Sequence, residues 1–216
     1  MSLFDNDGSY IELLKKHNCG PIKGIVHVGA WDMYENKWYL PMVGENVVWV
    51  EANPYTYSTM SKPAADKVNQ KCYSFAACNI DDQNVHLYIP YAPTRGDCSS
   101  LAKKTALGEG TPIVVKTKTL DTLFKEENLD INNYDFLNVD TEGAELLTLQ
   151  GFEGNLDKIK YLVVEITKKD RFNTGCSFET LDKYLTEKGF VLKEMSILYD
   201  DDWGDAFYIR PGGDSK

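Results

Sequence analysis

The sequence predicts an α/β protein with a mostly parallel sheet, and three observations support this fold class. Short apolar runs of strand length recur along the 216 residues, stretches with helical spacing separate most of them, and the runs are continuous rather than alternating. Continuous apolar strands are expected where helices cover both faces of a sheet. Strands and helices that follow one another in turn are typical of parallel strands joined by right-handed crossovers.

The expected strands form one sheet of seven. The first five are the continuous apolar runs, and the last two are joined through the acidic, polar segment 199–204. Such a connection is expected to close the sheet with an antiparallel hairpin. In chain order the expected strands are residues 25–28, 47–50, 72–77, 134–139, 161–166, 190–197 and 206–210.

Helices are expected on both faces of this sheet and in an N-terminal segment, 1–20. The region 84–118 breaks the rhythm, because two alternating runs, 86–89 and 113–116, flank a stretch rich in Pro and Gly. We expect an inserted hairpin or flap there, a disordered tail at 211–216, and a single domain over 1–216. The helical spacing itself is found at 55–68, 120–127, 144–150 and 178–188.

Composition and charge narrow the expected partners. The chain has 33 acidic and 23 basic side chains and a formal net charge of −10, which repels phosphate backbones and anionic membranes. We therefore expect no nucleic-acid or membrane partner. No apolar run approaches the roughly 18 residues of a membrane span, and the start lacks a signal-peptide pattern, so a soluble, cytoplasmic protein is expected. The five cysteines form no CxxC pair and are expected to be reduced thiols.

The residues that follow the strands are the candidate site residues, because ligands of open α/β sheets bind beyond the carboxyl ends of the strands. Gly29 follows the first strand and either admits a ligand or makes a tight turn. Glu51 follows the second strand, 22 residues beyond Gly29, and either binds the two ribose hydroxyls of an adenosine or is solvated. The GxGxxG pattern is missing, which favours an adenosine cofactor without phosphates over NAD or FAD.

Several segments resemble the FkbM family of S-adenosylmethionine-dependent O-methyltransferases. They are IVHVGAWDMYENKWYLPMVGENVVWVEANP, SSL, TKTLDTL, DFLNVDTEGAELLTLQGF and LVVEI, in the family's own order between residues 24 and 166. The segment from Asp140 to Glu145 is the most specific part. The sequence departs from the family after Ala30, where members commonly have a further glycine and this chain has Trp31-Asp32-Met33-Tyr34-Glu35.

The resemblance implies a Rossmann-like class I methyltransferase fold, with S-adenosylmethionine as cofactor. By position, it implies that Gly29 and Ala30 approach the methionine part, that Glu51 binds the ribose with Asn53 beside it, and that Ala77 and Cys78 flank the adenine.

Two further polar residues are candidates for cofactor contacts. Ser100 lies in the segment that matches the family, and it either places a hydroxyl near the cofactor or caps a helix. His27 lies in the first strand, where it either contacts the cofactor or the acceptor, or is a satisfied strand histidine.

Three carboxylates are the candidate catalytic residues: Asp140, Glu142 and Glu165. Asp140 and Glu165 end neighbouring strands and are expected to face one crevice, where Asp140, or second Glu142, takes the proton of an acceptor hydroxyl and Glu165 orients that hydroxyl. Alternatively, all three bind Mg²⁺, which acidifies the bound hydroxyl. The structural alternative is that Asp140 or Thr141 caps a helix starting near Glu142.

The function predicted from these residues is methyl transfer to a hydroxyl of a saccharide or nucleotide sugar. Family members modify sugars, and aromatic rings in predicted loops suit a carbohydrate site, although core packing also explains them. Two other functions stay open: a binding or regulatory module without turnover, and a nicotinamide-dependent oxidoreductase. The aromatic residues concerned are Trp31, Tyr34, Trp38, Tyr39, Tyr88, Tyr91 and Trp203.

Overall fold

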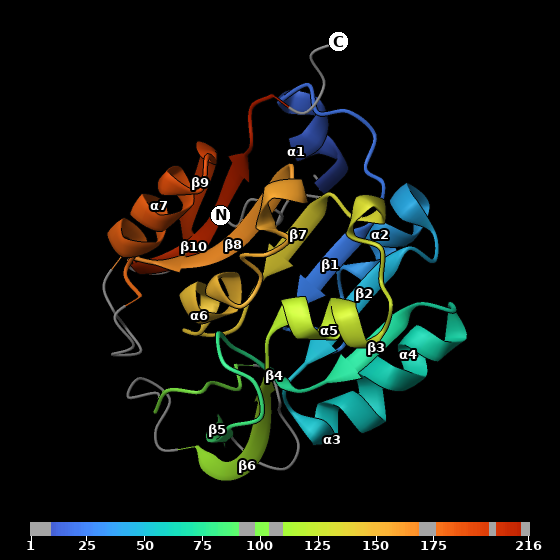
Figure 1. The fold of residues 1–216 in the computed structure, drawn as a ribbon, viewed down its shortest axis with the longest axis vertical. Coiled ribbons are helices and arrows are strands. Elements are labelled where there is room, and N and C mark those ends of the chain that lie inside the picture. The colour runs from blue at the N-terminus through green and yellow to red at the C-terminus, as the bar shows by residue number, and fades with distance from the viewer. Residues whose placement is uncertain (1–9, 91–97, 104–109, 169–175, 199–201, 213–216) are drawn as a thin grey trace.

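The computed structural model describes residues 10–90, 98–103, 110–168, 176–198 and 202–212, and its centre is a seven-stranded sheet (Figure 1). The strand order is β3-β2-β1-β7-β8-β10-β9. The strands are β1 (Ile25–Val28), β2 (Val47–Glu51), β3 (Lys71–Ser74), β7 (Phe136–Val139), β8 (Tyr161–Thr167), β9 (Val191–Leu198) and β10 (Trp203–Ile209). This architecture confirms the predicted fold class.

Pairing within the sheet is parallel from β3 to β8 and antiparallel at the C-terminal hairpin. β1 pairs with β2 on one side and with β7 on the other, and all four of its residues are buried. β10 pairs antiparallel with both β8 and β9. The strand order reverses between β1 and β7, which is where a ligand site is expected in an open α/β sheet.

Two layers of helices cover the sheet, and each encloses its own apolar cluster. The helices are α1 (Tyr10–Lys16), α2 (Asn36–Val43), α3 (Pro54–Thr56), α4 (Lys62–Lys67), α5 (Leu120–Glu126), α6 (Glu145–Gln150) and α7 (Phe178–Glu187). α1, α2 and α4 pack on strand residues such as Trp49 and Phe136, while α5, α6 and α7 pack on their neighbours, such as Val50 and Leu137. Successive strand residues thus serve opposite layers, which explains the continuous apolar runs.

Short irregular turns interrupt the helical segments. The helix expected over 55–68 is divided into α3, a π-helical turn η1 (Tyr57–Ser61) and α4. Two 3₁₀ turns, η2 (Ile131–Asn133) and η3 (Leu156–Lys158), precede β7 and β8. In the parts of the chain that the structure describes, no helix has both the length and the apolar character that crossing a bilayer requires.

The third predicted strand, 72–77, is broken in the structure. β3 ends at Ser74, and the chain resumes as β4 (Ala76–Ala77), which belongs to a separate three-stranded sheet. The side chain of Phe75 stays in the core on the α5–α7 face. The break therefore turns the chain out of the main sheet at its edge strand, immediately beside the expected ligand site.

The small sheet has the order β4-β6-β5, with β5 (Asn84–Ile89) antiparallel to β6 (Thr111–Lys118). It lies below the main sheet in Figure 1. The segment around Ser100 joins β5 through a bridge between Ser100 and Tyr88. Parts of the expected flap, 91–97 and 104–109, lie outside the described residues, as do 1–9 of the N-terminal segment and 213–216 of the tail.

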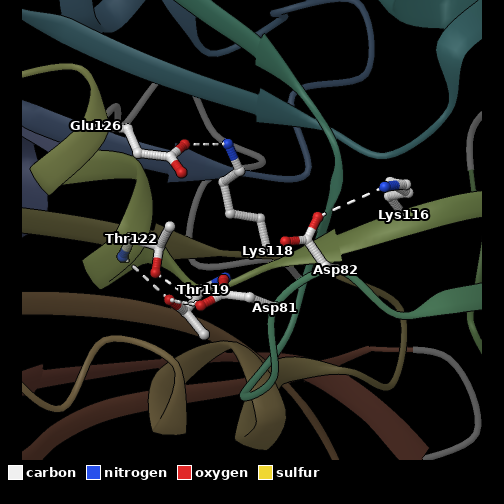
Figure 2. A network of polar contacts seen from close by, with 7 residues as sticks. All are labelled: Asp81, Asp82, Lys116, Lys118, Thr119, Thr122 and Glu126. Atoms are coloured by element: carbon white, nitrogen blue, oxygen red, sulfur yellow. Dashed lines mark hydrogen bonds and ion pairs between the residues drawn. The ribbon is translucent and has the colours of Figure 1, made fainter.

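A polar network fastens the small sheet to α5 (Figure 2). The Asp81 carboxylate accepts hydrogen bonds from the backbone N–H of Thr119, at 2.6 Å, and from the Thr122 hydroxyl, at 2.7 Å. Lys118 at the end of β6 pairs with Glu126 of α5 at 2.5 Å. Thr119 is also the N-cap of α5. The same residues therefore pair free N–H groups at the start of the helix and hold the small sheet against α5.

Candidate functional site

A pocket opens at the carboxyl ends of β1, β2 and β7, beside the small sheet. The space at this site, open mouth included, is about 780 Å³. Its walls are Val28, Gly29, Trp31, Val50, Glu51, Ala52, Phe75, Ala76, Ala77, Leu87, Cys98, Ser99, Leu101, Asp140, Thr141, Glu142 and Ala144.

Glu51, at the end of β2, is held rigidly in the pocket wall. One carboxylate oxygen accepts the backbone N–H of Asn53 and the other that of Trp31, both at 2.7 Å. Each oxygen keeps a second lone pair for a hydroxyl in the pocket. Burial raises the pKa of Glu51 to about 7, although those backbone hydrogen bonds act in the opposite direction.

Gly29 allows the ends of β1 and β7 to meet. Its φ is +98°, and a Cβ at this position would lie 1.8 Å from the carbonyl oxygen of Asp140. The glycine is thus required by the close approach of two backbones, and it also lines the pocket. The loop that follows contains two left-handed residues, Trp31 at φ 39° and Met33 at φ 60°, where family members have a further glycine.

The three candidate catalytic carboxylates converge at one end of the pocket. Each of Asp140, Glu142 and Glu165 offers a ligand oxygen, and these three oxygens lie within 4.8 Å of one another. Glu165 is buried in β8, two residues before the strand ends, whereas Asp140 reaches the solvent of the pocket. The expectation that residues after neighbouring strands share one crevice agrees with this geometry.

The electrostatics of these acids favour their protonated forms. Although Asp140 is exposed to the pocket, the loss of water around it within the surrounding protein, followed by the charge of Glu142, raises the pKa of Asp140 well above its usual range. The same two influences, with Asp140 as a third, raise the pKa of Glu165. Asp205, which lies opposite Glu165 on β10, adds negative charge near both Asp140 and Glu165. Glu35, before α2, adds negative charge near Asp140.

The loop between β7 and α6 is shaped by Glu145, not by a side-chain cap on the helix. The Glu145 carboxylate accepts the backbone N–H groups of Thr141, at 3.0 Å, and Gly143, at 2.9 Å. α6 begins at Glu145 with Ala144 as an uncapped N-cap, so neither Asp140 nor Thr141 caps it. The predicted capping by Asp140 or Thr141 is therefore wrong, whereas Glu145 lies in the first turn of the helix, where a carboxylate favours the positive helix end.

The small sheet supplies a second constraint on this loop. The Ser100 hydroxyl donates to the carbonyl of Glu142 at 2.5 Å and accepts the backbone N–H of Ala102 at 3.0 Å. Glu142 itself has a left-handed φ of 53°. Ser100 does not line the pocket wall, where its neighbour Ser99 lies; its hydroxyl fixes the acid loop instead.

His27 lies away from the pocket, in the layer under α2. Its Nδ1 is 3.0 Å from the Tyr39 hydroxyl, and its ring stacks on Trp49 with centroids 4.8 Å apart. Burial lowers the pKa of His27 to about 3, so the ring is neutral. The cofactor contact expected for His27 is not supported, because a residue directed to this face of β1 cannot reach the other face.

The remaining predicted cofactor residues divide into two groups. Ala77 joins Gly29 and Glu51 in the pocket wall, whereas Ala30, Asn53 and Cys78 are next to wall residues but do not form the wall themselves. Asn53 caps α3 by accepting the backbone N–H of Tyr55. Sequence reasoning missed wall residues from the broken strand and the flap, and it missed Glu35 and Asp205, which no short motif identifies. The missed wall residues include Ala52 after β2, Phe75 and Ala76 at the broken strand, and Leu87 of β5, whereas Ser99 and Leu101 belong to the SSL segment that was expected near the cofactor.

Solved structures similar to this chain include methyltransferases of low sequence identity, which inform about the fold alone. The O-methyltransferase TomG of Streptomyces achromogenes, in complex with S-adenosylmethionine, has a TM-score of 0.56 and 11% identity, covering 98% of this chain and 82% of TomG. A protein from Klebsiella pneumoniae assigned as an O-methyltransferase has a TM-score of 0.53 and 11% identity, covering 97% of this chain and 82% of its own. None of the curated proteins compared with the chain matches it.

The sequence itself identifies the family. The profile described as the methyltransferase FkbM domain matches residues 23–192, which include the pocket and all three acids. This match covers more than half of the 216 residues, and the seven-stranded fold agrees with it. The chain therefore belongs to the FkbM family of S-adenosylmethionine-dependent methyltransferases.

Proposed function

We propose that this protein transfers a methyl group from S-adenosylmethionine to a hydroxyl of a saccharide, with Asp140 as the proton acceptor. The observation that carries this proposal is that Glu51 and Asp140 line the same pocket. A group suited to ribose hydroxyls and a carboxylate suited to a reacting hydroxyl are thus within reach of one bound molecule.

The pocket residues suit S-adenosylmethionine in charge and polarity. Glu51 keeps free lone pairs for the two ribose hydroxyls, and the apolar wall, with Phe75, Ala77 and Leu87, suits an adenine ring. A nearby sulfonium cation would favour the ionised form of Asp140, which lines the same pocket. The pocket lies at a strand-order reversal without a GxGxxG turn, which disfavours a cofactor with a pyrophosphate, such as the nicotinamide cofactors.

Asp140 supplies the chemistry that an aliphatic hydroxyl lacks. When bound, S-adenosylmethionine supplies a methyl group on a positively charged sulfur. Asp140 takes the proton as the acceptor oxygen bonds to that methyl group, so that a neutral hydroxyl does not have to act alone as nucleophile. Its raised pKa makes Asp140 a stronger proton acceptor than an ordinary Asp. Activation by a divalent cation such as Mg²⁺ is the alternative to the carboxylate alone.

A saccharide acceptor is supported by one exposed ring in the pocket wall. Trp31 lines the pocket and is 39% exposed. Tyr34 is also exposed but does not line the pocket, and the Lys37 ammonium lies 3.6 Å from the centre of its ring. Flat apolar rings with polar edges suit sugar faces. Tyr39, from the same aromatic set, is fully buried, and Tyr91 lies outside the described residues. The net charge of −10 favours an uncharged sugar over a nucleic acid, and a nucleotide sugar is the second acceptor class.

Calorimetric titration with S-adenosylhomocysteine, S-adenosylmethionine and NAD tests the cofactor. We expect binding of the first two and none of NAD, followed by a mass gain of one methylene on a saccharide from a hydroxyl-acceptor panel. If the protein binds the S-adenosyl compounds but methylates no member of a broad acceptor panel, the result would favour a binding or regulatory module without turnover. Failure of both S-adenosyl compounds to bind would contradict the proposal.

Glu51→Gln is expected to weaken S-adenosylhomocysteine binding by about tenfold or more, because Gln removes charge and lone pairs from the ribose end. In the parent, affinity is expected to rise with pH across about pH 6–8, since the pKa of Glu51 is about 7 and the ionised form is the better acceptor. Calorimetry at several pH values measures both effects. Equal affinities and pH profiles for parent and variant would remove Glu51 from the cofactor site.

A further inference from the structure

We propose that Asp140, Glu142 and Glu165 together bind one divalent cation, and that the acceptor coordinates this ion through two oxygens on neighbouring carbons. The assignment of the acceptor rests on the proposed function, whereas cation binding by the three acids does not. Hard divalent cations such as Mg²⁺, Mn²⁺ and Ca²⁺ prefer carboxylate oxygens.

The spacing of the three carboxylates fits a shared ion. Two ligands of one ion are separated by at most twice the ion–oxygen distance, which is about 4.2 Å for Mg²⁺ and about 4.6–5.2 Å for Ca²⁺. The ligand oxygens of Asp140, Glu142 and Glu165 lie within 4.8 Å of one another. Ca²⁺ fits this arrangement as it stands, whereas a smaller ion such as Mg²⁺ requires the most separated oxygens to approach each other by up to about 0.6 Å.

Glu165 gives the independent indication of a ligand. It is only 8% exposed, and among the described residues its Oε2 has no hydrogen-bond partner. A buried carboxylate oxygen without a partner is costly, because it has lost its water and gained nothing in exchange. The Glu165 carboxylate lies close to two other carboxylates, and its residue pairs with Asp205 of the neighbouring strand β10. A cation at this position would satisfy the orphaned oxygen and cancel the repulsion among the acids.

The other two ligands place the ion at the wall of the cofactor pocket. Asp140 and Glu142 both line that wall, while Glu165 lies behind them in β8. Hard cations take about six to eight oxygen ligands, so three protein ligands leave positions for water or acceptor oxygens. These positions face the pocket, because the protein ligands occupy the opposite side.

The ion explains which acceptors would react. A hydroxyl bound to it loses its proton more readily, and a second oxygen on the adjacent carbon holds the acceptor in one orientation. The O–H bond breaks with its proton passing to Asp140, an O–CH₃ bond forms, and the electrons of the broken S–CH₃ bond remain on sulfur as a neutral thioether. Vicinal diols of sugars therefore match the site, whereas isolated hydroxyls do not.

Titration of the chelator-treated protein with Mn²⁺, without cofactor or acceptor, tests the cation site directly. Calorimetry and electron paramagnetic resonance are expected to show one bound Mn²⁺ in the parent. Glu165→Gln is expected to weaken this binding by at least tenfold, and the control Glu187→Gln, an exposed residue of α7, is expected to leave it unchanged. S-adenosylhomocysteine affinity should be the same in all three proteins, since Glu165 does not line the cofactor wall.

Thermal unfolding with and without Mn²⁺ keeps the test independent of folding defects. The parent and Glu187→Gln are expected to be stabilised by Mn²⁺, while Glu165→Gln folds but gains no stability. Absence of Mn²⁺ binding in a parent that binds S-adenosylhomocysteine would overturn the cation site and leave the carboxylate base standing. Mn²⁺ binding without S-adenosylhomocysteine binding would instead contradict the proposed function. With an active acceptor, a deoxy analogue lacking the neighbouring hydroxyl should lose the Mn²⁺-dependent rate.

Discussion

Replacement of Asp140 by Asn is expected to lower the rate of methyl transfer by about 10²–10⁴-fold, because the reacting hydroxyl loses the group that accepts its proton. The side chain keeps its size, and Asn still occupies the pocket wall. S-adenosylhomocysteine affinity should therefore remain within a few-fold of the parent. Steady-state kinetics with a saccharide acceptor and calorimetry with S-adenosylhomocysteine measure the two effects separately.

The pH profile and a matched variant test this assignment further. Asp140 acts as a base only when ionised, and desolvation and the charge of Glu142 raise its pKa, so without a bound cation the parent rate should rise with pH over a higher range than an ordinary Asp would give. The residual rate of Asp140→Asn should lack that rise. Asp66→Asn makes the same chemical change on the exposed face of α4 and should behave as the parent. A rate for Asp140→Asn close to that of the parent would contradict the assignment of Asp140 as the base.

Gly29→Ala is expected to prevent stable folding. Its Cβ would lie 1.8 Å from the Asp140 carbonyl oxygen and 2.8 Å from the carbonyl carbon, and both are backbone atoms that cannot move without separating β1 from β7. The left-handed φ of +98° adds about 1–2 kcal/mol of strain for Ala. The total free energy of unfolding of a domain is only about 5–15 kcal/mol, so the cost of separating two central strands is expected to exceed what the fold can tolerate. Denaturant unfolding and the yield of folded protein measure the effect.

Gly44→Ala provides the matched control for this clash. Gly44 also has a positive φ, +60°, but a Cβ there meets no atom within 4 Å. The control should therefore cost only backbone strain, about 1–3 kcal/mol. Free energies of unfolding of the two variants can be compared to within about 0.5 kcal/mol. If those of the two alanine variants differ by less than about 1 kcal/mol, the close approach of the two backbones is not the reason that position 29 requires glycine.

The sequence predicts the strands of the main sheet well, because their apolar residues are buried on both faces. β1 and β7, for instance, each have four buried residues in a run of four, as expected for strands covered on both faces. It also predicts that Asp140 and Glu165 meet, since parallel neighbours bring their carboxyl ends to one edge. Both inferences depend on local pattern and general topology alone.

Features set by long-range pairing were beyond such reasoning. The apolar run 72–77 reads as one strand, but Ala76 and Ala77 pair with Thr117 and Lys118 of β6, far along the chain, rather than with β2. The position of Asp205 opposite Glu165 depends on the register of β10, which no turn signal specifies. The role of His27 was equally hard to predict, because its neighbours Tyr39 and Asn138 come from other elements of the fold.

The place of β10 in the sheet has a consequence for synthesis on the ribosome. β10 lies between β8 and β9, although it follows both in the chain. Until residues 203–209 have left the ribosome, β8 presents an unpaired edge, and β9, already synthesised, lacks the strand on which it pairs in the finished sheet. Unpaired apolar edges are the usual starting point of association between incomplete chains. Nascent chains stalled just before residue 203 should therefore depend on chaperones more than the finished protein does.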